Sequence, residues 1–149
     1  MIIVRKLTSI LQEMTEDTDC LLASWQYNNM AKGNVRLDNK LPNPTALLVQ
    51  IADWDLNLNM NTKKEAAEVS VFFLDKETKL DNEALYQDIT IDNCSDIAID
   101  FIKRVMADKS LKIMEDTIKV KSVFYQSDSN RTGVCIQFRI EQRQGECIE

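Results

Sequence analysis

The sequence predicts an α+β fold: a bent, mostly antiparallel sheet with an N-terminal helix and a second amphipathic helix packed on one face. Two observations predict it. Apolar residues recur at helical spacing near the N-terminus and again in residues 93–109, and alternating, strand-like segments separate and follow these two stretches. The chain has 149 residues, the length of one domain, so we expect a single domain over residues 1–149.

The first helix is expected at the N-terminus, followed by a strand over Cys20–Tyr27. A long polar connection then leads to Leu41-Pro42-Asn43-Pro44, where each proline favours extended backbone in the residue before it. The apolar residues of the helix share one face because they lie three and four apart. They are Ile3, Leu7, Ile10, Leu11 and Met14.

The strongest strand signal changes its phase partway along. Leu47, Val49 and Ile51 share one parity, and an apolar stripe of the other parity follows them. A change of parity turns the apolar side chains to the opposite face of a sheet. We therefore expect a β-bulge or bend at Ala52–Asp53, or a break into two strands there. The stripe that follows is Trp54, Leu56, Leu58 and Met60.

The returning strand, Glu68–Asp75, is apolar at both parities, which is typical of a central strand covered on both faces. Two later strands, Thr117–Tyr125 and Val134–Arg143, are expected to complete the sheet. Phe101 of the main helix and Phe138 of the last strand are expected to be buried against this same sheet.

The main helix carries the best cluster of carboxylates. Asp92, Asp96 and Asp100 lie four residues apart, so they share one face and could hold a divalent cation through oxygen ligands. A solvated helix face has the same pattern, and we prefer that interpretation. Asp92 is also an expected N-cap, and Asp100 is spaced for an ion pair with Arg104.

Composition argues against several classes of function. The chain has no histidine to act as a base and only three glycines with which to build a phosphate-binding loop. Its net charge of −6 disfavours binding of nucleic acid through phosphates. Its apolar runs are too short for a membrane span, and its start does not resemble a secretory signal. We therefore predict that the protein is not an enzyme and has no catalytic residue and no residue that binds a cofactor or a metal. We also predict that it does not bind nucleic acid sequence-specifically and has no membrane partner.

The cysteines have two interpretations. Cys20, Cys94, Cys135 and Cys147 lie far apart and form no Cys-x-x-Cys pair. Without histidine, a structural zinc site would need all four, in the absence of the usual close pairing. Reduced thiols, some of them buried as small apolar groups, are the simpler interpretation.

The apolar stripe after the bend is most simply part of the core. If the change of parity carries it off the main sheet face, it becomes a contact surface, because exposed apolar stripes mark interfaces. Lysines follow it at the expected turn, where they usually serve solubility but could also touch a phosphate. The candidate interface residues are Trp54, Leu56, Leu58, Met60, Lys63 and Lys64.

The order of elements resembles the tail-terminator and tail-completion (minor tail) proteins of long-tailed bacteriophages and prophages. The resemblance rests on Leu41–Ile51, the return through Glu68–Asp75, the helix at Ser95–Met106 and the closing hairpin at Asn130–Ile140. It covers most of the chain and brings no catalytic signature with it.

The resemblance implies a structural virion protein that forms a ring, commonly hexameric, which caps the tail tube and joins it to the head-neck region. Its implied partners are other copies of itself and the tail-tube and neck proteins, in the virion and, during assembly, in the host cytoplasm. The alternative function is a small, acidic, monomeric inhibitor or adaptor that binds a basic protein surface.

Overall fold

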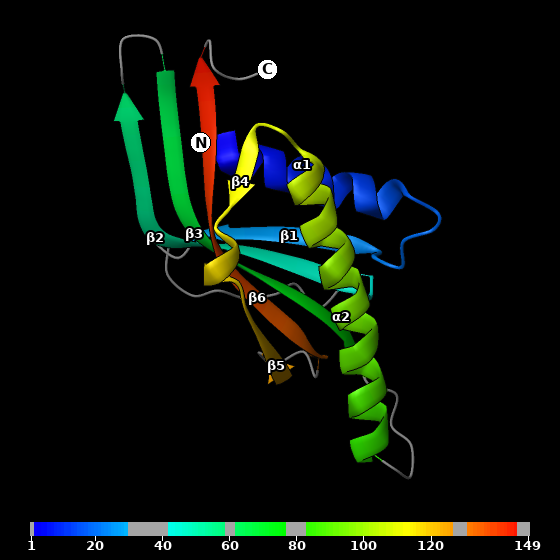
Figure 1. Ribbon diagram of the computed structural model, residues 1–149. Helices are drawn as coiled ribbons and strands as arrows, with labels where there is room; N and C mark the ends of the chain where they lie inside the picture. The colour runs from blue at the N-terminus through cyan, green and yellow to red at the C-terminus, as the bar shows by residue number, and fades with distance from the viewer. Residues whose placement is uncertain (1, 30–41, 59–61, 77–82, 127–130, 146–149) are drawn as a thin grey trace.

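The computed structural model has the predicted α+β fold and describes residues 2–29, 42–58, 62–76, 83–126 and 131–145. Figure 1 shows the sheet with both helices beside it. The elements in chain order are α1 (Ile2–Glu16), β1 (Ser24–Asn29), β2 (Thr45–Leu58), β3 (Thr62–Lys76), α2 (Glu83–Ala107), β4 (Leu111–Ile113), the 3-10 helix η2 (Glu115–Thr117), β5 (Lys119–Gln126) and β6 (Arg131–Gly145).

The described strands form one six-stranded sheet in the order β1-β2-β3-β6-β4, with β5 beside another part of β6. β1 runs parallel to β2, and the other described pairs are antiparallel. β3 and β6 pair along their whole lengths and form the spine of the sheet. Their backbones meet closely at Gly133, where a Cβ atom would lie 1.9 Å from the carbonyl oxygen of Phe73, so only glycine fits.

The main core lies between this sheet and both helices. Phe101 of α2 packs against Phe73 of β3 and Phe138 of β6, with ring centroids 5.5 and 6.5 Å apart. The expected burial of Phe101 and Phe138 against one sheet is confirmed. A smaller cluster that includes Leu47 and Leu74 lies on the other face, since side chains alternate along a strand. β3 is therefore a central strand with apolar residues on both faces, as predicted.

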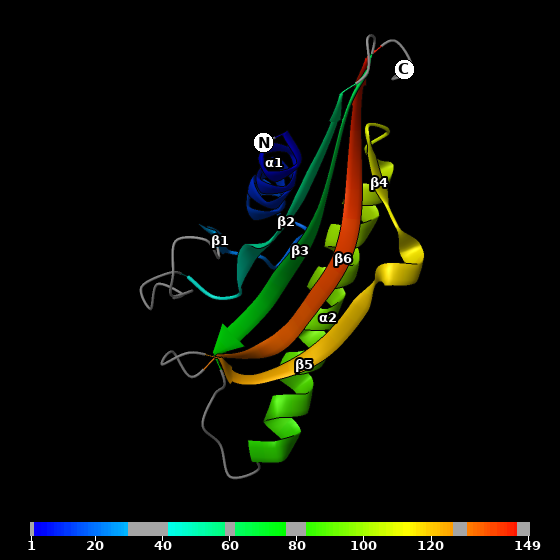
Figure 2. The ribbon, with the colours of Figure 1, turned by 90° about the vertical axis from the view of Figure 1, so that its left-hand side faces the viewer.

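The predicted bend in β2 is confirmed. β2 pairs with β3 in one register from Thr45 to Gln50 and in another from Trp54 to Leu58, and the irregularity lies between Gln50 and Trp54. β2 continues through the bend as one strand. Figure 2 shows β3 and β6 curving together with it.

The start of the main helix was predicted wrongly. α2 begins at Glu83, so Asp92 lies inside the helix and is not its N-cap. The first part of the helix includes the exposed residues Asp88 and Asp92, and charged residues are compatible with a solvent-facing helix. The expected ion pair is confirmed, with Arg104 Nε 3.1 Å from Asp100 Oδ1.

Polar contacts hold the helices to each other and to the next turn. Arg104 Nη2 donates to Asp17 Oδ2 at 2.6 Å, which joins α2 to the end of α1. Lys6 of α1 donates to Ser110 and lies 3.4 Å from Asp108, in the turn after α2. Neither α1 nor α2 has an apolar stretch that could cross a membrane.

Candidate subunit interface

Three strands project past the bend, and together they form what we call the arm: Trp54–Leu58 of β2, Thr62–Ala67 of β3 and Ile140–Gly145 of β6. Figure 1 shows their ends extending beyond both helices. β1 pairs with β2 only as far as Gln50. Among the described strands, none covers the outer edge of β2 within the arm, so its backbone groups are open to another strand.

One face of the arm and its base carries ion pairs between different strands. Arg139 Nη2 of β6 donates to Asp55 Oδ2 of β2 at 2.7 Å, and this hydrogen bond raises the pKa of the Arg139 guanidinium. Lys64 Nζ of β3 lies 3.2 Å from Glu141 Oε1 of β6. Exposed pairs of this kind contribute little stability. The first joins β2 to β6 across β3, and the second joins β3 to β6.

The other face of the arm presents two leucines. Leu56 and Leu58 are register partners of Glu65 and Lys63, and their side chains are 42% and 68% exposed. Glu65 of β3 is buried, whereas the two leucines opposite it on the edge strand β2 are exposed. The arm thus offers an apolar pair beside an open strand edge, and such a surface favours contact with another protein.

The six candidate interface residues all belong to the arm or its turn, but the structure describes them unevenly. Lys63 and Lys64 lie in β3 instead of in the turn, and Lys64 is engaged with Glu141. Leu56 and Leu58 lie outside the core. Met60 and the side chains of Trp54 and Lys63 lie outside the described part of the chain. Their role as an interface stays a prediction.

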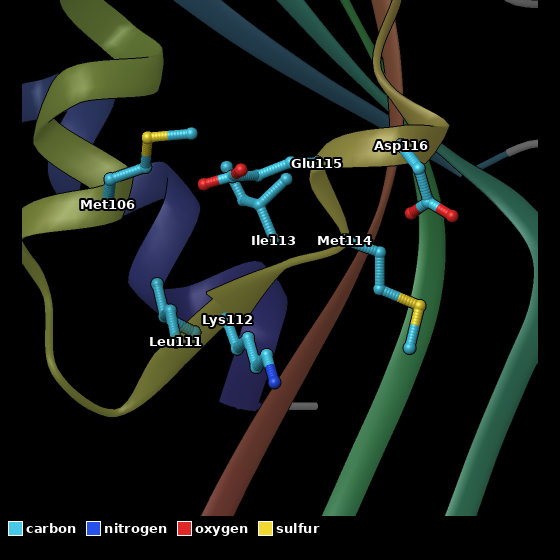
Figure 3. A pocket seen from close by; sticks show the side chains of 7 residues that line it. All are labelled: Met106, Leu111, Lys112, Ile113, Met114, Glu115 and Asp116. Carbon is cyan, nitrogen blue, oxygen red and sulfur yellow. The ribbon is translucent and has the colours of Figure 1, made fainter.

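A groove lies where α2 ends and the chain turns into β4, and sequence analysis did not anticipate it. It is open to solvent, with a volume of about 840 Å³. Figure 3 shows Ile113 and Glu115 extending toward Met106 of α2, whereas Met114 and Asp116 lie on the far side of η2. Met106 is 46% exposed and Ile113 is buried, so the groove has an apolar floor. Its lining residues are Met106, Leu111, Lys112, Ile113, Met114, Glu115 and Asp116.

The chemistry-bearing side chains are dispersed. In the part of the chain that the structure describes, no three His, Cys, Asp or Glu residues are grouped to hold a metal ion. Cys20, Cys94 and Cys135 are free thiols, and Cys147 lies outside the described residues. Burial raises the pKa of Cys94 to about 12 and that of Cys135 to about 11, so both are protonated at neutral pH. A protonated thiol is a poor nucleophile.

The acidic face of α2 does not act as one unit. Asp92 and Asp96 are exposed to solvent, whereas Asp100 is held by Arg104. This is the arrangement of a solvated helix face with one ion pair.

No protein-family model matches this sequence, and no curated protein matches it.

Proposed function

We propose that this protein is a structural subunit that assembles through its arm into a closed ring, as the proteins it resembles do, and that the ring caps the tail tube of a long-tailed phage beside the neck. The observation that carries the proposal is the exposed pair Leu56 and Leu58 on a projecting arm. For a protein that acts alone, such a pair beside an open strand edge is a liability, because both features favour association. In a ring, a neighbouring subunit covers them.

The charge distribution is compatible with this role. The chain carries a net charge of −6, and Asp88, Asp92 and Asp96 are exposed along α2. A ring lined by carboxylates would repel the phosphates of DNA and let it pass without being held. An acidic inhibitor or adaptor would account for the same charges, and its partner could also cover the two leucines, so the assembly state separates the two functions.

The test compares two leucines of equal exposure. Leu58 of the arm is 68% exposed, and Leu21, between α1 and β1, is 67% exposed. Sedimentation velocity should find the wild-type protein in an assembly several times larger than the 17.1 kDa chain. Leu58→Asp should sediment as a monomer, and its unfolding midpoint should equal that of the wild type at concentrations where the wild type is also monomeric. Leu21→Asp should assemble like the wild type.

Two results would count against the proposal. A wild-type protein that stays monomeric, even when mixed with a tail-tube protein, removes the ring and favours the inhibitor or adaptor. Equal assembly of Leu58→Asp and the wild type shows that the arm is not the contact.

A further inference from the structure

We propose that Asp55 selects the register in which the outer half of β2 pairs with β3, and so decides which face of the arm carries Leu56 and Leu58. In an antiparallel ladder, a slip of one residue turns every side chain of the slipping segment to the opposite face. The inference deepens the proposed ring and rests on it only for its consequence in assembly, because the register is a property of the single chain.

Only the outer half of β2 has the freedom to change its register. β3 and β6 pair without a break along their whole lengths, and the first half of β2 is buried and held by β1. Between Gln50 and Trp54 the ladder is interrupted, and residues 51–53 of β2 lie opposite the single residue Glu68. Residues 55–58 beyond this interruption are all exposed. Burial therefore does little to choose between registers there.

The nearest alternative register has an ordinary backbone. If the outer half of β2 moved by one residue toward the start of β3, two residues would oppose Glu68, which is the usual count in a β-bulge. Asn57 would then lie opposite Lys63 instead of Lys64. Leu56 would move to the face of the arm that carries Lys64. We call this arrangement the slipped register, and side chains must distinguish it from the observed one.

In the observed register, Asp55 is paired with a cation. Arg139 Nη2 of β6 donates to Asp55 Oδ2 at 2.7 Å, and Ala66, the register partner of Asp55 on β3, is too short to come between them. This hydrogen bond is the main cause that raises the pKa of the Arg139 guanidinium. Glu68 of β3 and Glu141 of β6 contribute through their charges. Of these three carboxylates, Asp55 is the one on β2, so its pair with Arg139 resists a movement of β2.

In the slipped register, Asp55 would face an acidic side chain. It would lie opposite Glu65, which is 1% exposed and is the partner of Leu56 in the observed register. Like charges directly opposite each other on neighbouring strands are destabilising. Asp55 therefore favours the observed register in two ways, through the cation that it contacts and the acidic side chain that it avoids.

Disulfide trapping measures the register directly. Asn57→Cys is combined with Lys64→Cys, its partner in the observed register, or with Lys63→Cys, its partner in the slipped register. Directly opposite residues are close enough for a disulfide, whereas side chains on opposite faces point apart. Closure is followed in a glutathione buffer at a dilution where the protein is monomeric, and peptide mapping by mass spectrometry identifies the new bond. The 57–64 pair should close much faster than the 57–63 pair.

Asp55→Asn is then added to both chains. It removes the Arg139 contact and the like charge opposite Glu65 together, and the side chain of Asp55 is 62% exposed, so folding should not depend on it. The ratio of 57–63 to 57–64 closure should rise about fivefold, the effect of losing one ion pair at the upper end of the range for exposed pairs. Arg139→Gln should raise the ratio less, because Glu65 still opposes the slip.

Glu68→Gln is the matched control. It removes a carboxylate that acts on the same guanidinium but belongs to β3, so it should leave the ratio unchanged. Two results would overturn the inference: a ratio that Asp55→Asn leaves unchanged, or a ratio that Glu68→Gln raises equally.

Sedimentation judges the ring separately. If Asp55→Asn leaves the ratio unchanged while the wild type assembles and Leu58→Asp does not, the inference fails and the ring stands. If the wild type is monomeric, the ring fails and the register result stands by itself. If Asp55→Asn shifts the register but assembles like the wild type, the inference holds, and the face that carries the leucines is not the contact in the ring.

Discussion

The two halves of β2 differ completely in burial although they belong to one strand. Every residue from Thr45 to Val49 is buried, and every residue from Asp55 to Leu58 is exposed. The first half has β1 on its outer edge and apolar clusters on both faces. The second half has β3 on its inner edge and, among the described strands, nothing on its outer edge. Apolar alternation thus predicts a strand in both halves, but neighbours decide whether its leucines form core or surface.

The largest expected effect lies in the body of the sheet. Phe101 is fully buried between Phe73 and Phe138. Phe101→Ala should lower the free energy of unfolding by about 3–5 kcal/mol, because it leaves a cavity in the main core. Urea denaturation followed by circular dichroism measures the change. An unchanged midpoint would mean that α2 does not pack on the sheet through this face.

The most direct test of the comparison uses one leucine from each half of β2. Leu48 is fully buried, and Leu58 is 68% exposed. Leu48→Ala should cost about 2–5 kcal/mol of unfolding free energy, whereas Leu58→Ala should change it by less than about 0.5 kcal/mol in the monomer. Because assembly adds stability, both variants should be measured at concentrations where the protein is monomeric. Similar losses in the two variants would contradict the division of β2 into core and arm.

Local signals account for the parts of the fold that the sequence predicts correctly. The helical spacing in α1 and the parity change near Ala52–Asp53 depend on residues close in sequence, and both are confirmed. The start of α2 was placed at about Asn93 because Asp92 resembles an N-cap, but the helix begins at Glu83. The length of α2 depends on its packing against the sheet, and helix propensity carries no information about this packing.

The groove could not be predicted from the sequence, for a physical reason. β4 and η2 are three residues long each, too short for periodicity to be visible. Their positions depend on pairing with β6 and on the end of α2, which are distant in sequence. The parallel pairing of β1 with β2 is nonlocal in the same way. The parity change, by contrast, is a local signal and places the bend in β2. The stripe after it was most simply interpreted as core, but Leu56 and Leu58 lie outside the core, which is the alternative that the parity change left open.

The smallest expected effect concerns a contact between the two helices, far from the arm. The hydrogen bond from Arg104 lowers the pKa of Asp17 below its usual value of 3.8, with a contribution from the backbone of Asp19. A carboxyl whose pKa is lower in the folded state adds stability above its unfolded pKa, and this stability is lost as pH falls through the folded value. Asp17→Asn should therefore destabilise the protein slightly at neutral pH, and the difference from the wild type should disappear well below pH 3.8.

Urea denaturation of the monomer between neutral pH and this acidic range measures the difference in stability. Asp19→Asn is the control, because it removes a nearby charge and keeps the Arg104 contact. Assembly at neutral pH should be the same for both variants, because neither touches the arm. A difference between Asp17→Asn and the wild type that grows in acid would show that Asp17 is not stabilised by Arg104 in the folded state.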